Sequence, residues 1–115
     1  MSNVKESLKY ESEYGDIDYG YLKKSVEYPN GLIVLHGSIV HKKWRGQGKF
    51  KEMLKMLFNE YPEETVVQAA TISKKLTSMF KRIGFKEVDK IEYWGAPANC
   101  TTLQGKINRD ILKLL

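Results

Sequence analysis

The sequence predicts an α+β domain built around a mixed β-sheet. Up to residue 40, apolar residues follow the alternating period of strands and are separated by turn signals, which predicts an antiparallel meander. From Gly48 on, apolar residues follow the helical period, and helical segments alternate with short apolar runs. A strand–helix–strand connection makes two strands parallel, so we expect a strand–helix–strand–helix–strand unit after the meander. The length of 115 residues predicts that residues 1–115 form one domain.

The first half of the chain carries the strand and turn signals of the meander. Asn30-Gly31 tolerates positive φ at both central positions of a turn and therefore predicts a tight hairpin. Gly37 interrupts an apolar run and predicts a β-bulge or a close approach by another group. The expected strands are Ser7–Glu13, Tyr19–Tyr28 and Leu32–Val40, with a turn at Tyr14–Asp18.

The second half predicts two helices and two further strands. Apolar residues at Phe50, Met53, Leu54, Leu57, Phe58 and Tyr61 form one helical stripe, which Pro62 ends. A second helix should begin after Ser73, a plausible N-cap, and end before Gly84. The expected strands are Thr65–Thr71 and Phe85–Trp94, and Lys106–Leu115 is open to either a strand or a short helix.

Composition narrows the range of functions. Hydrophobic residues make up 42% and charged residues 29%, no apolar run could span a membrane, and the N-terminus lacks a signal-peptide core. We therefore expect a cytoplasmic protein. One cysteine and two histidines argue against a disulfide framework or a structural zinc site, so no metal is expected. The net charge of +5 favours anionic partners.

The most informative stretch is the glycine-containing turn from Arg45 to Phe50. A helix N-terminus presents unpaired N–H groups, and Gly46 and Gly48 let an anion approach without a Cβ in the way. Nearby lysines and Arg45 add positive charge. The spacing matches neither a Walker A motif nor a dinucleotide fingerprint. The turn is either a phosphate-binding nest or an ordinary turn with solvated cations.

The stretch Val40-x-x-x-Trp44-Arg45-Gly46-Gln47-Gly48 before an amphipathic helix resembles the acyl-CoA signature of the GNAT superfamily of N-acetyltransferases, Arg/Gln-x-x-Gly-x-Gly/Ala. Phe80 to Phe85 is similar to that superfamily's later helix-to-strand segment. The resemblance covers about residues 25 to 95. It implies a GNAT-like mixed sheet and transfer of an acetyl group from acetyl-CoA to an amine that attacks directly.

The resemblance also implies roles for individual residues. Arg45, Gly46 and the backbone amides of Gln47, Gly48, Lys49 and Phe50 would hold the pyrophosphate of coenzyme A. The backbone of Ile39 and Val40 would pair with the pantetheine arm, and the strand before the second helix would splay away to admit the thioester. Ser73 stands where the family often has an asparagine that contacts pantetheine; as an N-cap it would have a purely structural role.

Three features depart from the family pattern. Phe50 fills the final Gly/Ala position, where its side chain should point into the core. Phe80 stands at the usual position of a tyrosine proposed to protonate the leaving thiolate. The stretch before the hairpin has no room for the two usual helices. An open acceptor side would suit a protein lysine or N-terminus, or it could mark an acyl-CoA-binding module without catalysis.

His36 is the candidate general base, because it lies on the strand that leads into the signature and a neutral imidazole can take an ammonium proton. The alternative is a strand histidine that only faces solvent. A basic nucleic-acid-binding face is a further alternative, although aromatic residues do not interleave with the basic residues as they do in base-stacking platforms. An exposed sheet edge leaves open a homodimer with two-fold symmetry.

Overall fold

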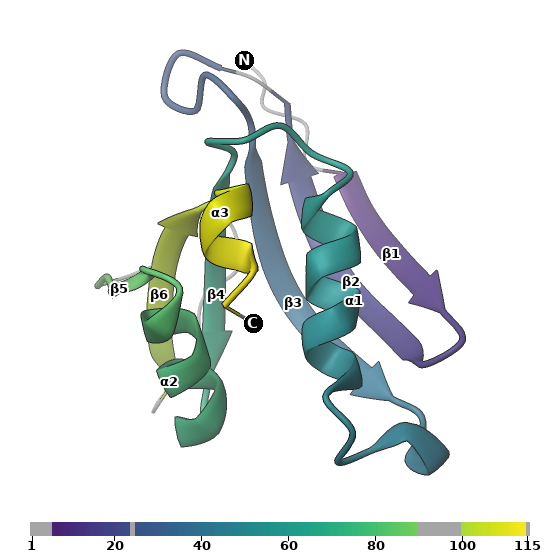
Figure 1. The fold of residues 1–115 in the computed structure, drawn as a ribbon. Coiled ribbons are helices and arrows are strands. Elements are labelled where there is room, and N and C mark those ends of the chain that lie inside the picture. Colours follow the sequence, from purple (N-terminus) through teal and green to yellow (C-terminus); the bar gives the residue numbers. More distant parts are fainter. Residues whose placement is uncertain (1–5, 24, 90–99, 115) are drawn as a thin grey trace.

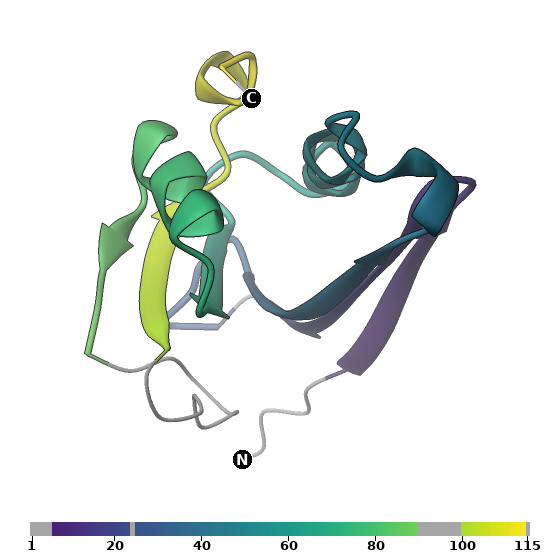
Figure 2. The same ribbon diagram turned by 90° about the horizontal axis from the view of Figure 1, so that it is seen from below.

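The computed structural model describes residues 6–23, 25–89 and 100–114. These residues form a six-stranded mixed sheet in the order β1-β2-β3-β4-β6-β5, with helices α1, α2 and α3 on one face (Figures 1 and 2). The strands are β1 (Glu6–Ser12), β2 (Gly15–Leu22), β3 (Leu32–Val40), β4 (Val66–Thr71), β5 (Lys86–Glu87) and β6 (Thr101–Lys106). The helices are α1 (Lys49–Phe58), α2 (Lys74–Arg82) and α3 (Arg109–Leu112), and a 3-10 turn spans Lys42–Trp44. The expected α+β class with its mixed sheet is confirmed.

The meander is confirmed, but the boundaries expected for its second strand were wrong. β1 and β2 pair antiparallel around a turn at Glu13 and Tyr14, so β2 begins at Gly15 and ends at Leu22. The Ser12 hydroxyl closes the turn by accepting from the Tyr14 N–H and donating to the Gly15 carbonyl. The two aspartates of β2 have low strand propensity and gave a turn signal, but the intervening Ile17 is buried, so the segment pairs as a strand.

The tight hairpin expected at Asn30-Gly31 was also wrong. β2 and β3 do pair antiparallel, but residues 23–31 connect them. The Gly31 N–H donates to the Tyr28 carbonyl at 2.9 Å, and Gly31 has a φ of 92° while Asn30 does not have a positive φ. A type I′ turn needs positive φ at both positions, so this is a different turn. Tyr28 is buried against Leu22 and Leu32, and this packing draws the longer loop over the end of the sheet.

The hydrophobic core lies between the sheet and its helices. α1 buries Met53, Leu54, Leu57 and Phe58 of the predicted stripe, but it ends at Phe58, so Tyr61 lies beyond the helix. α2 buries Met79 and Phe80. They pack on strand residues that point to the same face, Ile33, Val67 and Leu103. Full burial of each large apolar side chain contributes about 1.5–3 kcal/mol before entropy is counted. The core therefore holds α1 and α2 against the sheet.

The parallel step between β3 and β4 is confirmed, and it positions the site. The ladder runs from Leu32↔Val66 to Leu35↔Ala69 and ends there, although β3 continues to Val40 and β4 to Thr71. The register of β3 against β2 shifts after Leu35, so His36 is the extra residue of a β-bulge next to Gly37. A bulge bends its strand, and Figure 1 shows β3 diverging from β4 beyond this point. β3 and β4 therefore separate beyond Leu35, as expected from the sequence.

The C-terminal strand β6 was not predicted. It lies between β4 and β5 and pairs antiparallel with both. Its sequence TTLQGK is largely polar, and Gly105 is needed because Phe85 covers it: a Cβ added there would lie 2.1 Å from Phe85 Cδ1. Of the strand expected at Phe85–Trp94, the structure describes the two-residue β5, and residues 90–99 lie outside the described part of the chain.

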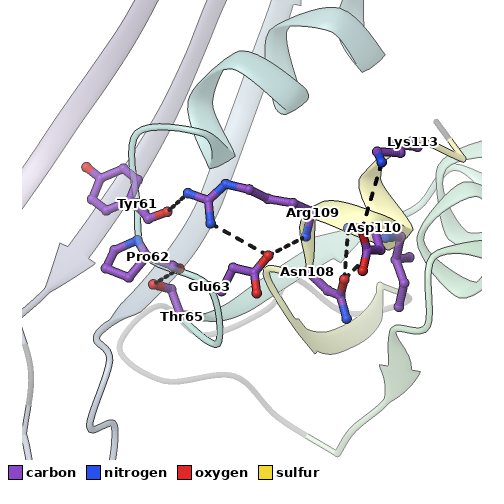
Figure 3. Close-up of polar contacts among 9 residues, drawn as sticks. Tyr61, Pro62, Glu63, Thr65, Asn108, Arg109, Asp110 and Lys113 are labelled. Carbon is purple, nitrogen blue, oxygen red and sulfur yellow. Dashed lines mark hydrogen bonds and ion pairs between the residues drawn. The ribbon is translucent and has the colours of Figure 1, made fainter.

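The tail expected as either strand or helix forms α3 after β6 ends. Figure 3 shows how α3 is attached to the loop between α1 and β4. Arg109 Nη2 donates to the Tyr61 carbonyl at 3.0 Å, and Arg109 Nη1 lies 3.7 Å from Glu63 Oε1. Asn108 Oδ1 caps the helix by accepting from the N–H groups of Asp110 and Ile111. These contacts fix the chain after α1 and so support the crossover to β4.

Candidate functional site

The turn before α1 exposes backbone amides. Gly46 and Gly48 have φ angles of 77° and 73°, in the left-handed region that glycine adopts without a Cβ penalty. A Cβ added at either residue would meet nothing within 4 Å, so this side of the turn is open. Gly48 is the N-cap of α1 and provides no side-chain cap, which leaves the first N–H groups of the helix without a side-chain acceptor. The local geometry is that of an anion nest.

Two side chains of the turn hold it in place. Arg45 Nε donates to the Val40 carbonyl at 3.0 Å, which ties the turn to the end of β3. Gln47 Nε2 donates to the Lys43 carbonyl at 2.9 Å. The backbone conformation of the nest is therefore partly set before any anion binds. Arg45 uses only its Nε in this contact, so its terminal amino groups can still face a ligand.

The side chain of Lys49 packs against the rings of Tyr14 and Trp44. Its Nζ lies 4.5 Å above the Tyr14 ring, 5.4 Å from the Trp44 ring centre and 3.3 Å from Glu52 Oε2, and the side chain is only 18% exposed. Trp44 packs edge-on against Tyr14 at 5.1 Å, and its Nε1 is buried without a hydrogen-bond partner among the described residues. The Lys49 ammonium group is therefore held beside the turn by the two rings and by Glu52.

A cleft of about 690 Å³ opens beside the turn, between the N-terminal part of α1 and α2. Apolar side chains in its wall are Val40, Trp44, Phe50, Leu76 and Met79. Cations in its wall are Arg45, Lys49, Lys51, Lys75 and Arg82, and no carboxylate is among the described residues that line it. An elongated ligand with phosphates at one end and an apolar arm fits this arrangement of charge and surface.

The cleft brings together most of the residues expected to bind coenzyme A. Val40, Arg45, Gly46, Gly48, Lys49 and Phe50 line it. Phe50 also packs against the core, as expected. The side chains of Ile39 and Gln47 do not line it, and Ile39 is 60% exposed. The contacts expected from these two residues involve their backbone groups and stay predictions.

Ser73 is the N-cap of α2, as its structural alternative proposed. Its hydroxyl accepts from the Leu76 N–H at 3.1 Å, and it does not line the cleft. A contact from Ser73 to pantetheine stays a prediction. Phe80 is 2% exposed and stacks on Phe85 with ring centres 5.1 Å apart. The position where the family usually has a tyrosine is therefore part of the core in this chain.

His36 is exposed and lies at the bulge, directly after Leu35, the last β3 residue paired with β4. It does not line the cleft. Its backbone is thus at the point where the two strands separate, while the anion nest lies at the far end of β3. This separation along β3 is compatible with an extended ligand that reaches from the nest to the splay.

Sequence reasoning missed the α2 side of the cleft. Lys75, Ser78 and Arg82 lie at i, i+3 and i+7, which places them on one helical face, next to the apolar stripe. The signal was present in this spacing, but the position of α2 opposite the nest follows only from the fold. No group of three His, Cys, Asp or Glu residues in the described part of the chain could hold a metal ion. Within those same residues, no helix is both long and apolar enough to cross a membrane.

Several solved structures share this fold at low sequence identity. A presumed acetyltransferase from Agrobacterium tumefaciens matches at a TM-score of 0.62 and 16% identity, over 91% of this chain and 77% of that one. An aminoglycoside N(6′)-acetyltransferase from Legionella pneumophila matches at a TM-score of 0.60 and 17% identity, over 89% of this chain and 60% of that one. Arabidopsis thaliana Naa50, in complex with the bisubstrate analogue CoA-Ac-MVNAL, matches at a TM-score of 0.55 and 15% identity, over 82% of this chain and 66% of that one.

These likenesses establish the architecture of the chain: it has the fold of the GNAT acetyltransferases. The identities are too low to transfer an activity, and the chain spans less than two thirds of the length of the Legionella and Arabidopsis structures. No protein-family model and no curated protein sequence matches the chain. The assignment of fold therefore depends on three-dimensional arrangement.

Proposed function

We propose that this chain is an N-acetyltransferase that moves an acetyl group from acetyl-CoA to an amine. One observation carries the proposal: in a GNAT-like fold, the open glycine turn directs the first amides of α1 into a cleft lined by cations and apolar side chains. The amides of Gly48, Lys49 and Phe50, with Arg45, hold the pyrophosphate of acetyl-CoA. Lys75 and Arg82 add positive charge from α2.

The edge of β3 beyond Leu35 receives the pantetheine arm. The ladder to β4 ends at that residue, so the backbone of Ile39 and Val40 faces β4 without a partner strand on that side. The thioester is bound where β3 and β4 separate. Acetyl-CoA supplies an activated acetyl carbon, which an amine can attack without an enzyme nucleophile.

His36 takes the proton from the attacking amine. It lies beside the point where the strands separate, and an imidazole is suited to this proton transfer near neutral pH. No described residue is assigned as the general acid, because Phe80 has no proton to donate and is buried. A thiolate is a good leaving group compared with an alkoxide, so an acid is less important here.

The acceptor is a protein lysine or N-terminus. The described residues before β3 form two strands and no helix, and the helices of the chain lie on one face of the sheet (Figure 2). Among the described residues no helix covers the opposite face next to the splay, and a large acceptor suits such a face. The Naa50 structure was solved with an analogue that joins coenzyme A to a peptide sequence, which agrees with this class of acceptor. We place this activity in the cytoplasm.

The first test is a thermal melt with coenzyme A, acetyl-CoA, ATP and a short DNA duplex. A ligand that binds only the folded state raises the melting temperature, so both coenzyme A species should raise it and ATP and DNA should not. A rise with DNA alone would instead favour a nucleic-acid-binding module. Release of free thiol from acetyl-CoA, measured with lysine-containing and free-N-terminus peptides, then tests transfer.

The His36→Ala variant tests the proposed base. It should lower kcat by about 100-fold or more while the melting shift with coenzyme A is retained. A change of only a few-fold would remove His36 from the mechanism. Coenzyme A binding without any thiol release on the peptide panel would favour a binding module that has lost catalysis, which the buried Phe80 at the usual tyrosine position also favours.

A further inference from the structure

Strand β1 forms one edge of the sheet built by the described residues. Among the described residues β1 pairs only with β2, so its other side offers unpaired N–H and C=O groups. Proteins usually protect such edges with charged side chains, proline, a bulge or a covering segment. Among the described side chains of β1, the exposed charges are Lys9 and Glu11, which have opposite signs and can therefore pair with a strand that carries the complementary charges. β1 has no proline, and its pairing with β2 runs without a register shift from Glu6 to Ser12. It is therefore suited to accept a further strand.

A groove of about 540 Å³ runs beside this edge, between the C-terminal half of β1 and α1. It is lined by Tyr10, Glu11, Ser12, Glu13, Tyr14, Glu52, Lys55 and Met56. Met56 is 46% exposed, and Leu8 and Tyr10 are only half-buried on this face. A strand added to β1 would bring its own side chains into this groove and cover exposed apolar surface.

The other face of β1 carries a cation and an anion two residues apart. Lys9 and Glu11 are both exposed there. Glu11 lies directly opposite Asp16 of β2, a pairing of like charges that costs stability. Lys9 lies opposite Asp18, with Nζ 3.9 Å from Oδ1. A cation placed on the outer side of Glu11 would relieve the repulsion, and β1 itself carries that cation two residues away.

We propose that two copies of this chain form a homodimer by antiparallel pairing of their β1 strands, with Tyr10 at the two-fold axis. An axis perpendicular to the sheet keeps the helices of both copies on the same face and always passes through one residue of β1. With Tyr10 on the axis, Lys9 faces the partner's Glu11 and Glu11 faces the partner's Lys9. The two sheets then join into one continuous sheet.

The neighbouring registers are less favourable. Centring the axis on Lys9 places Lys9 against the partner's Lys9, and centring it on Glu11 places Glu11 against the partner's Glu11. Like charges directly opposite each other are destabilising, whereas opposite charges stabilise the pair. The Tyr10 register also brings Leu8 of each copy beside the partner's Ser12, at the groove next to Met56. Charge and apolar burial thus select the same register.

A charge swap tests this interface directly. Sedimentation velocity over a concentration series should show a dimer for the unmodified chain. Lys9→Glu and Glu11→Lys should each raise the dimer dissociation constant by about tenfold or more, because each creates two like-charge pairs across the axis. The double variant should restore the dissociation constant to within a few-fold of the original. Asp18→Asn is the control for the Lys9–Asp18 contact within one copy and should leave dimerisation unchanged.

Cross-linking tests the register. In a Cys100→Ser background, Tyr10→Cys should form an interchain disulfide on oxidation, because residue 10 faces its own copy across the axis. Ser12→Cys in the same background is the matched control and should not. A chain that stays monomeric at every concentration, or a dimer whose dissociation constant is insensitive to both single charge reversals, would overturn the proposal. The groove shares no lining residue with the candidate cleft, so this outcome is independent of coenzyme A binding.

Discussion

Substitution of Gly48 by aspartate should abolish most coenzyme A binding while the fold is retained. Gly48 has φ 73° and ψ 16°, and a Cβ there would meet nothing within 4 Å, so the new carboxylate would enter the open side of the nest. Two unit charges at about 5 Å repel by about 3 kcal/mol at an effective dielectric of about 20. Solvent in an open cleft and salt weaken this, so we expect a loss of about tenfold to 100-fold in affinity.

The matched control is Gly48→Asn, which has the same size as aspartate but no charge and tolerates the left-handed conformation better than most residues. Both variants should lose about 1 kcal/mol of stability from the backbone strain of an L-residue at this φ. Titration calorimetry with coenzyme A should then show affinity falling much further for aspartate than for asparagine. Equal affinities for Gly48→Asp and the unmodified chain would refute the assignment of this turn as the phosphate site.

Three further predictions concern stability. Gly105→Ala should lower the free energy of unfolding by about 2–3 kcal/mol because its Cβ would collide with the Phe85 ring, whereas Gly37→Ala, with open space, should change it by less than about 0.5 kcal/mol in chemical denaturation; equal midpoints would contradict the packing. Burial, and then the hydrogen bond with Tyr19, raise the pKa of Tyr61 above its ordinary value of 10.0. The neutral phenol therefore stabilises the folded state fully below pH 10, and this contribution to the free energy of unfolding is lost as the pH rises further. The melting temperature should therefore fall more steeply above pH 10 in the unmodified chain than in Tyr61→Phe, and parallel curves would exclude this role. Arg109→Ala should cost about 1 kcal/mol by releasing α3, while Lys113→Ala, whose contact with Asp110 is solvent-exposed, should cost close to nothing; a reversed order would show that α3 is not held by Arg109.

Local patterns were sufficient to predict several elements of the fold. β3 spans the predicted Leu32–Val40, and α1 buries four residues of the predicted apolar stripe. Both ends of α2 also follow local rules. The Ser73 hydroxyl caps the helix N-terminus, and Gly84, directly after the C-cap residue Ile83, adopts the left-handed φ of 94°. These features depend on neighbours within a few residues.

Prediction failed where distant parts of the chain decide the structure. TTLQGK has weak strand propensity, but it becomes β6 because it lies between β4 and β5 and because Phe85 packs over Gly105. Asn30-Gly31 carries a strong hairpin signal, but the burial of Tyr28 selects a longer connection. In each case tertiary packing outweighs a local preference of at most about 1 kcal/mol.

The sequence by itself determined the glycine turn, its cations and the helix that follows it, because the conformational freedom of glycine and the unpaired amides of a helix N-terminus are local properties. Only the tertiary structure decided that Lys75 and Arg82 of α2 line the same cleft as this turn, that His36 lies where β3 leaves β4, and that β1 is an edge strand among the described residues. These relations join residues far apart in the chain, and the sheet order and core packing that bring them together have no signature in any short segment.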